Sequence, residues 1–190
     1  MSLWRRLCTG EEPGLATFIE ELGHPWLRML EQTPQDPEWH GEGDVAVHTE
    51  MVLAALYAHP LPEISRERRA VQILGAALHD LAKPVTTRTE RIGDRDRVVA
   101  RRHEALGRSA LAYLGTLPFA ALWPVMGLVG SHHEPKLLVV KDSPLGDWRR
   151  VSRRARMADL AALELADRRG RRCPDREAQV DRIAWFAVLA

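Results

Sequence analysis

The segment GAALHDLAKP (75–84) places ionisable residues inside a run of small and apolar residues. Its composition is typical of a buried helix, and Pro84 is expected to stop that helix. His79 and Asp80 stand next to each other in the middle of the run, with Lys83 one turn further on. Because an unpaired charge is strongly unfavourable in an apolar interior, the fold has to supply partners for both side chains.

Apolar residues recur with helical spacing along most of the chain. Pro13 is a plausible first helical residue, while Asp44 and Ser65 are expected N-caps. Residues 33–44 are predicted as a loop because they are rich in Pro, Gly and Asp. Helices are expected over residues 13–23, 24–32, 45–59, 66–82, 102–116, 118–132, 152–169 and 175–189.

The resulting prediction is one all-α domain over residues 1–190. Its core is expected at about residues 40–170, with the helices of 13–32 and 175–189 as appendages. At most a short hairpin or ordered loop is expected around residues 86–100, where Thr and Val residues flank a Gly-Asp turn signal.

The composition is that of a soluble globular protein, with 45% apolar and 28% charged residues in a chain of 190. No apolar run reaches the ~18 residues of a membrane span, so no membrane partner is expected. The N-terminus lacks the continuous apolar stretch of a secretory signal. Cys8 and Cys173 form no C-x-x-C pair, and a reducing cytoplasm is the expected location.

Charge is distributed unevenly along the chain. Residues 1–65 carry 3 basic and 11 acidic side chains, whereas residues 149–190 carry 11 arginines and 6 acidic side chains. The arginine clusters at 149–156 and 167–172 have two interpretations. The commoner one is a solvated helix face with ion pairs four residues apart, and the alternative is a surface that holds phosphates bidentately.

Histidines and carboxylates recur in or at the ends of the predicted apolar helices. Taken singly, each is more often a hydrogen-bonded core or surface residue than a metal ligand. Taken together, neutral imidazoles and carboxylates suit Mn, Fe, Co, Ni or Zn. A bound cation would also stabilise Asp80, because a carboxylate can bridge two ions. The set comprises His48, His79, Asp80, His103, His132, His133 and Asp167.

The order His48, His79-Asp80, Asp167 resembles the HD superfamily of metal-dependent phosphohydrolases, which implies a helical bundle of the HD type. HGEGDVAVHTEMVL (40–53) and LHDLAKPVT (78–86) are similar to the HD domain found beside bacterial tRNA nucleotidyltransferases. Ala82 stands where that group usually has Gly. HEALG and HHEP match its later histidine segments. Relatives also occur in RNA-end-repair proteins.

The resemblance implies that one divalent ion is held by His48, His79, Asp80 and Asp167. A second ion would be held by His103 and His132, with Asp80 bridging the two. His132 is favoured over His133 because it begins an H-x-x-P spacing to Pro135, which leaves His133 as a second ligand, a substrate contact or neither. The ions expected are Mn, Ni, Co, Fe, Mg or Zn.

The resemblance also suggests catalytic roles. Lys83 matches a family lysine suited to holding a phosphate or orienting a water, and a structural ion pair is its alternative role. Arg102 and Arg168 are further candidates for phosphate binding. His103 or His133 is a candidate donor of a proton to the leaving oxygen.

The function expected is hydrolysis of phosphoesters of nucleotides or RNA ends, with 2′,3′-cyclic phosphates and 2′- or 3′-phosphates favoured. Nucleotide addition and kinase activity are not expected, because the sequence has no nucleotidyltransferase motifs and no G-x-x-x-x-G-K-[ST]. Two alternatives stay open: a di-iron oxygenase with the same six ligands, and a non-catalytic metal-containing module that binds RNA. The sequence indicates neither the oligomeric state nor whether the chain stands alone.

Overall fold

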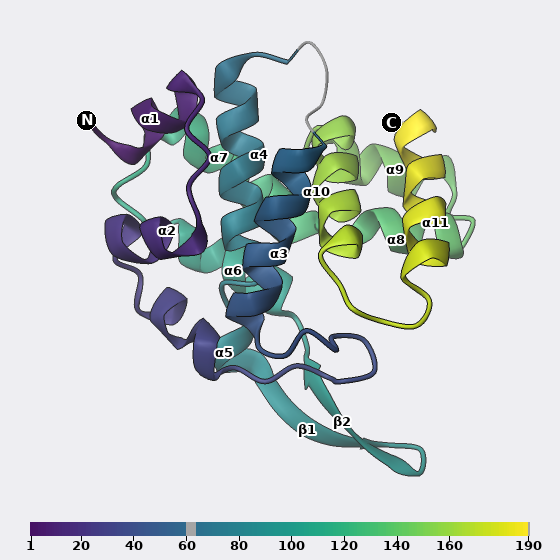
Figure 1. The fold of residues 1–190 in the computed structure, drawn as a ribbon. Coiled ribbons are helices and arrows are strands. Elements are labelled where there is room, and N and C mark those ends of the chain that lie inside the picture. Colours follow the sequence, from purple (N-terminus) through teal and green to yellow (C-terminus); the bar gives the residue numbers. More distant parts are fainter. Residues whose placement is uncertain (60–63, 190) are drawn as a thin grey trace.

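The computed structural model describes residues 1–59 and 64–189, which form eleven α-helices, one 3-10 helix and one two-stranded sheet (Figure 1). The predicted all-α class is confirmed. The elements are α1 (Leu3–Thr9), α2 (Leu15–Leu22), the 3-10 helix η1 (Pro25–Gln32), α3 (Val45–Ala58), α4 (Arg66–Leu78), α5 (Lys83–Thr86), β1 (Thr87–Ile92), β2 (Arg95–Ala100), α6 (His103–Leu111), α7 (Phe119–Ser131), α8 (Glu134–Val140), α9 (Leu145–Ser152), α10 (Met157–Arg169) and α11 (Arg176–Leu189).

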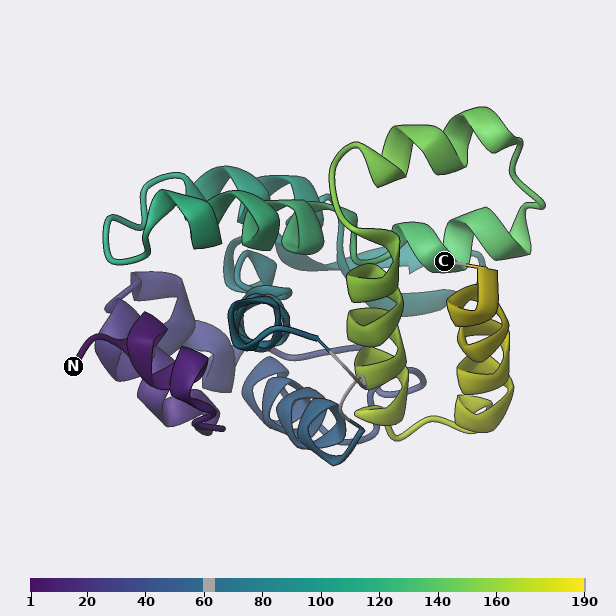
Figure 2. The same cartoon turned by 90° about the horizontal axis from the view of Figure 1, so that it is seen from above.

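Helix α4 is the centre of the bundle. It packs against α1, α3, α7 and α10, and Figure 2 shows it end-on with these helices around it. Every residue from Ala70 to Leu78 is buried. A helix that is apolar on all sides is stable only when other elements cover all of its faces. The chain that leaves α4 therefore delivers His79 and Asp80 into the interior.

Helices α3 and α10 cross closely beside α4. A Cβ added at Gly170, the residue that caps α10, would lie 2.8 Å from the backbone nitrogen of Val52 in α3. Only glycine permits this approach. Val52 lies one helical turn after His48, and Gly170 lies three residues after Asp167, so the same approach brings those two side chains together.

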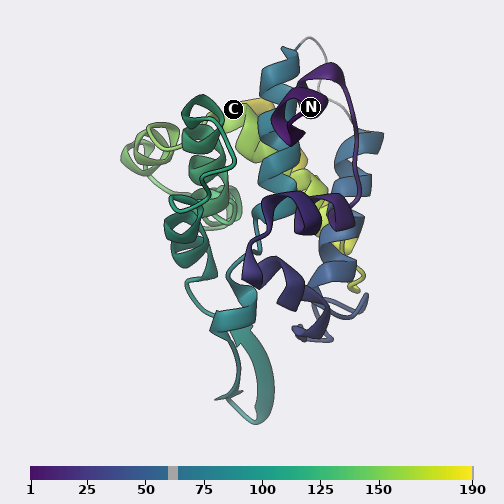
Figure 3. The ribbon, with the colours of Figure 1, turned by 90° about the vertical axis from the view of Figure 1, so that its left-hand side faces the viewer.

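The predicted hairpin is present. Strands β1 and β2 pair antiparallel from Thr87 opposite Ala100 to Ile92 opposite Arg95. Gly93, at a φ of +62°, and Asp94 form the two-residue turn between them. Figure 3 shows the hairpin extending away from the helices. Its inner end leads through α5 to the end of α4, and its other strand leads directly to α6.

Several predicted boundaries were wrong in the N-terminal half. Helix α2 begins at Leu15 with Gly14 as its N-cap, so Pro13 is not its first residue. Residues 25–32 form a 3-10 helix, whose period of three fits the buried Leu27 and Leu30. The helix predicted over 45–59 ends at Ala58, and Pro60, which was expected to stop it, lies outside the described residues.

The helix predicted over 66–82 ends at Leu78, and residues 79–82 form a turn. Pro84 does not stop a helix. It lies in the first turn of α5, where a missing N–H costs nothing. The N-caps Asp44 and Ser65 are confirmed, since their side chains accept hydrogen bonds from Val47 and Arg68 nitrogens respectively.

The predicted boundaries also shift in the C-terminal half. The helix predicted over 102–116 ends at Leu111, where a turn follows. The helix predicted over 152–169 begins at Met157, because residues 145–152 form the separate helix α9. Helices α1, α5, α8 and α9 were not predicted. Prolines accompany the starts of the last two, Pro135 in α8 and Pro144 before α9, and such residues also signal turns.

Within the described residues, no helix is both long enough and apolar enough to span a membrane.

Gly170→Ala should lower the free energy of unfolding by about 1–3 kcal/mol, because the added methyl group must push α10 away from the α3 backbone. Urea titration followed by circular dichroism measures this loss. Gly146→Ala in α9 is the matched control, since its added Cβ meets nothing within 4 Å. Equal stabilities of the two variants would contradict the close approach of α3 and α10.

Candidate metal centre

The six predicted metal ligands come from five separate parts of the fold and meet at one point. His48 lies in α3, His79 and Asp80 follow α4, His103 begins α6, His132 follows α7, and Asp167 lies in the last turn of α10. All six are buried, and His103, the most exposed, shows 4% of its surface. Helix ends and one helix face thus converge on a shared interior position.

The carboxylate of Asp80 is the middle of this cluster. Its Oδ2 lies 3.1 Å from Nε2 of His79 and 3.9 Å from Nε2 of His48. Its Oδ1 lies 3.1 Å from Nε2 of His103 and 3.9 Å from Nε2 of His132. Each oxygen of Asp80 therefore faces its own pair of imidazoles.

The two pairs are completed differently. Oδ1 of Asp167 lies 3.0 Å from Nε2 of His48, so the Oδ2 side of Asp80 has a second carboxylate. On the Oδ1 side, Nε2 of His103 and Nε2 of His132 are 3.3 Å apart. His48, His79 and Asp167 form one group with ligand atoms close enough to share an ion, and His103, His132 and His133 form another.

The tautomers of these imidazoles are set by their outward nitrogens. Nδ1 of His79, His103 and His132 each lies 2.7–2.8 Å from the backbone oxygen of the residue three positions earlier, namely Ala76, Ala100 and Val129. A carbonyl oxygen only accepts, so each Nδ1 donates and a neutral ring keeps its lone pair on Nε2. Nδ1 of His48 lies 2.9 Å from the buried carboxylate of Glu42 instead.

This donor set fits divalent cations. Within the described residues, Nε2 of His79 and both oxygens of Asp80 have no hydrogen bond, although the Lys83 ammonium lies 2.8 Å from Oδ2. Buried polar atoms left without partners are unfavourable, and lone pairs that converge on carboxylates repel one another. Imidazole nitrogen and carboxylate oxygen are ligands for divalent transition ions, and outward hydrogen bonds of this kind orient metal-bound histidines.

The pKa values of Asp80 and Asp167 indicate that both carboxylates are ionised and therefore attract cations. Burial raises the pKa of Asp80, but the charges of His79 and Lys83 outweigh this and hold it well below its usual value. Burial likewise opposes ionisation of Asp167, but the Arg171 and Arg168 charges hold its pKa well below the usual value. Both carboxylates are therefore anionic at neutral pH.

Burial and neighbouring charges also shift the pKa values of the imidazoles. Burial, followed by the charges of His133 and His103, lowers the pKa of His132 far below its usual value, so its ring is a neutral ligand. Burial also lowers the pKa of His79, but the Asp80 charge reverses the shift and raises the pKa overall. The carboxylate thus attracts positive charge at the position of the His79 Nε2.

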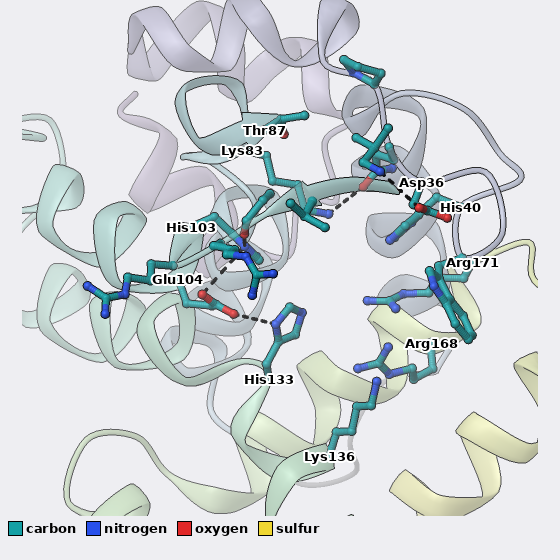
Figure 4. A pocket seen from close by; sticks show the side chains of 18 of the residues that line it. Asp36, His40, Lys83, Thr87, His103, Glu104, His133, Lys136, Arg168 and Arg171 are labelled. Carbon is teal, nitrogen blue, oxygen red and sulfur yellow. Dashed lines mark hydrogen bonds and ion pairs between the residues drawn. The ribbon is translucent and has the colours of Figure 1, made fainter. Parts of the chain in front are cut away.

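A pocket of about 830 Å³ opens onto this centre from one side (Figure 4). His103 and Lys83 line the pocket. The other five predicted ligands are buried and do not line it: His48, His79, Asp80, His132 and Asp167. The hairpin, the loop before α3, the start of α8 and the end of α10 complete the wall. A molecule in the pocket can therefore approach the cluster beside His103 and Lys83.

The remaining predicted site residues lie around this pocket. Lys83 lies between Asp80 and Gln35, with Nζ 2.6 Å from Oε1 of Gln35. His133 lines the pocket, and its Nδ1 lies 2.7 Å from Oε1 of Glu104. Arg102 is exposed at the pocket with a positive φ of 61°.

Arg168 also lines the pocket, but it is 2% exposed and its guanidinium is already engaged. Nε and Nη2 bind Glu164, and Nη1 donates to Gln179. Arg168 therefore contributes charge to the pocket wall more readily than new hydrogen bonds.

Several site residues were not predicted. Glu42 bridges His48 and His40, and its Oε2 accepts from the Arg172 nitrogen at 2.8 Å. Arg171 binds Asp167 through Nη2 at 2.6 Å. The spacing of four from Asp167 to Arg171 could have predicted that ion pair. No local pattern signals the role of Glu42.

A family model for the HD domain matches residues 45–184, well over half of the chain. The chain belongs to the HD-domain family. This HD domain accordingly falls within the superfamily of metal-dependent phosphohydrolases, whose members bind divalent ions, and its His and Asp groups could hold a metal. No curated protein matches the chain significantly.

Asp80→Asn should remove bound metal, because the amide keeps the shape of the side chain but loses the charge shared by both imidazole pairs. The measurement is elemental analysis after incubation with Mn²⁺ and gel filtration. Asp94→Asn in the exposed hairpin turn is the matched control and should keep the wild-type metal content. Wild-type metal content in Asp80→Asn would show that this cluster does not hold the ion.

Proposed function

We propose that this HD domain hydrolyses phosphoesters of nucleotides or RNA ends, with 2′,3′-cyclic phosphates and 2′- or 3′-phosphates as the favoured substrates. The observation that carries the proposal is a cation-rich pocket whose inner end is formed by His103 and Lys83, beside Asp80. A phosphate that enters it reaches the candidate metal centre.

The balance of charge in the pocket favours an anionic ligand. Its two lining carboxylates are both engaged: Asp36 pairs with Arg97 at 2.8 Å, and Glu104 lies beside His133. Clefts lined by charge of one sign concentrate ligands of the opposite sign. The lining cations are Lys83, Arg101, Arg102, Lys136, Arg168 and Arg171.

The pocket also has an apolar side that suits a nucleoside. Trp39 is 40% exposed at its edge, and the Arg97 guanidinium lies 5.8 Å from the centre of the Trp39 ring. Ile92 and Leu137 are also exposed along the lining. Nucleobases stack on aromatic side chains and on arginine, so these surfaces support a nucleotide over inorganic phosphate.

Divalent ions held by Asp80 and its neighbours would lower the pKa of a coordinated water and neutralise charge on the phosphate. Lys83 is fixed by Asp80 and Gln35, and its ammonium is proposed to donate to a non-bridging phosphate oxygen. Because Asp80 and Gln35 already restrict the position of the ammonium, the Lys83 side chain loses little conformational entropy when the substrate binds.

The proposed role of His133 is to position the attacking water or a ribose hydroxyl. Burial and the His103 charge lower the pKa of His133 far below its usual value, so its ring is neutral at neutral pH. With Nδ1 directed at Glu104, the lone pair of Nε2 is directed away from Glu104 and can accept a hydrogen bond from water or a ribose hydroxyl. The proton-donor role suggested by the sequence for His103 or His133 stays a prediction.

The RNA-end part of the proposal is supported by the segments at 40–53 and 78–86, which resemble the HD domains beside tRNA nucleotidyltransferases. We propose a cytoplasmic location and a single HD domain over residues 1–190 on the sequence grounds given above. A substrate phosphate is the partner that the pocket favours.

The metal-loaded protein should hydrolyse 2′,3′-cyclic AMP, 2′-AMP or 3′-AMP in the presence of Mn²⁺, Ni²⁺ or Co²⁺. Phosphate release measures the monoesters, and chromatography of the nucleotides measures ring opening of the cyclic diester. Asp80→Asn purified in parallel controls for contaminating phosphatases and should be inactive, because it lacks the carboxylate shared by both imidazole pairs.

The same assay separates the alternatives. Cleavage of deoxynucleoside monophosphates or cyclic dinucleotides, with none of the ribose 2′ or 3′ substrates, would contradict the RNA-end part and leave the hydrolase class intact. Binding of RNA without any hydrolysis would favour the non-catalytic module. Metal-dependent consumption of oxygen without phosphate release would favour the oxygenase.

A further inference from the structure

Three cations stand together on one side of the pocket. They are Lys136 from α8, Arg168 from the last turn of α10 and Arg171 just after it (Figure 4). Lys83 and Thr87, the first residue of β1, lie on the other side of the pocket in the same view. This group is named the outer cation cluster here, because it makes no contact with Asp80.

The cluster holds one more positive charge than its carboxylates can neutralise. Glu164 pairs with Arg168, and Asp167 pairs with Arg171. Among the residues that the structure describes, no carboxylate lies within ion-pair distance of the Lys136 ammonium, and Lys136 itself is exposed to the pocket. The excess charge therefore belongs to Lys136.

Lys136 shares the pocket wall with Arg168 and Arg171. Partial withdrawal from water, followed by the charges of Arg168 and Arg171, lowers the pKa of Lys136 against the smaller opposing effects of Glu164 and Asp167. A cation placed against two others raises the free energy of the protein alone, and an anion bound between them would remove that penalty. The outer cation cluster thus presents the exposed ammonium of Lys136, backed by the charges of the buried Arg168 and Arg171, to an incoming anion.

The cluster lies outward from the candidate metal centre. Arg171 touches Asp167, and Asp167 lies 3.0 Å from His48, so this arginine stands at the edge of the centre. Lys136 and Arg168 reach further and also line a smaller neighbouring cavity together with Gln179 and Ile183. A ligand that spans the pocket meets Lys83 at one end and Lys136 at the other.

We propose that the outer cation cluster is a subsite for a second phosphate, so that the preferred substrate carries two phosphates on one nucleoside. This rests on the proposed function, which places the phosphate to be cleaved beside Asp80 and Lys83. The second phosphate contacts Lys136. The required chemistry is present in a nucleoside 3′,5′-bisphosphate and in the terminal nucleotide of an RNA strand that ends in a 3′-phosphate.

The test compares two small substrates that differ by one phosphate, adenosine 3′,5′-bisphosphate and 3′-AMP. Values of kcat/KM are measured with the metal-loaded full chain, and dissociation constants are measured by calorimetry with the full chain in chelator. Wild-type protein should show a higher kcat/KM and a lower dissociation constant for the bisphosphate than for 3′-AMP. Lys136→Gln should reduce kcat/KM and affinity for the bisphosphate roughly three- to tenfold, and those for 3′-AMP less than about twofold.

Lys141→Gln is the matched control, since Lys141 follows the same helix, is exposed and does not line the pocket. It should behave as wild type with both substrates, and thermal unfolding should show that both variants are folded. A dinucleotide with a 3′-phosphate forms a further arm. If Lys136→Gln removes the preference of the protein for this dinucleotide over 3′-AMP, the subsite also serves RNA ends. If the preference is unchanged, the subsite is limited to free bisphosphates.

The outcomes separate this inference from the proposed function. No hydrolysis, combined with tighter bisphosphate binding that Lys136→Gln removes, would overturn the proposed function and support the subsite. Hydrolysis with the same substrate preference in wild type and Lys136→Gln would overturn the subsite alone. An equal loss for both substrates would place Lys136 at the cleaved phosphate and also overturn it.

Discussion

The carboxylate of Asp80 carries a charge at a position that is 2% exposed, and the arrangement around it follows from that constraint. An isolated carboxylate there would be protonated or would destabilise the fold. Four imidazole nitrogens and the Lys83 ammonium lie within 4 Å of its two oxygens. Helices α3, α4, α6 and α7 must end or cross beside Asp80 to bring these imidazoles within reach. The burial of this charge therefore depends on how the helices are arranged.

Helix ends are well suited to this task. The last carbonyl groups of an α-helix lack partners within the helix. In α4 and α7, Ala76 and Val129 offer such carbonyls to His79 and His132, which stand just beyond each helix. One hydrogen bond therefore satisfies a free carbonyl, fixes the tautomer and directs Nε2 at Asp80. His103 obtains the same geometry from Ala100 at the end of β2.

The sequence predicted the helical class, the hairpin and the residues that surround Asp80. The ligand set came from a resemblance in several ordered segments, whereas periodicity alone would have left each histidine as a core residue. Glu42 was missed because it lies in a loop six residues before His48, with no helical spacing to connect them, and because Arg172 reaches it across 130 residues of chain. The substrate-binding role of Arg168 stays a prediction. Its ion pair with Glu164 has the spacing of four that a sequence can indicate, whereas its contact with Gln179 depends on how α10 and α11 pack.

We propose that Asp80 would help to hold two divalent ions, one beside each of its oxygens. Anomalous diffraction from crystals equilibrated with saturating Mn²⁺ tests it most directly. The predicted result is two peaks, one among His48, His79 and Asp167 and the other beside His103 and His132, with Asp80 between them. No peak at Asp80, or a single peak with His103 turned toward solvent, would contradict the account.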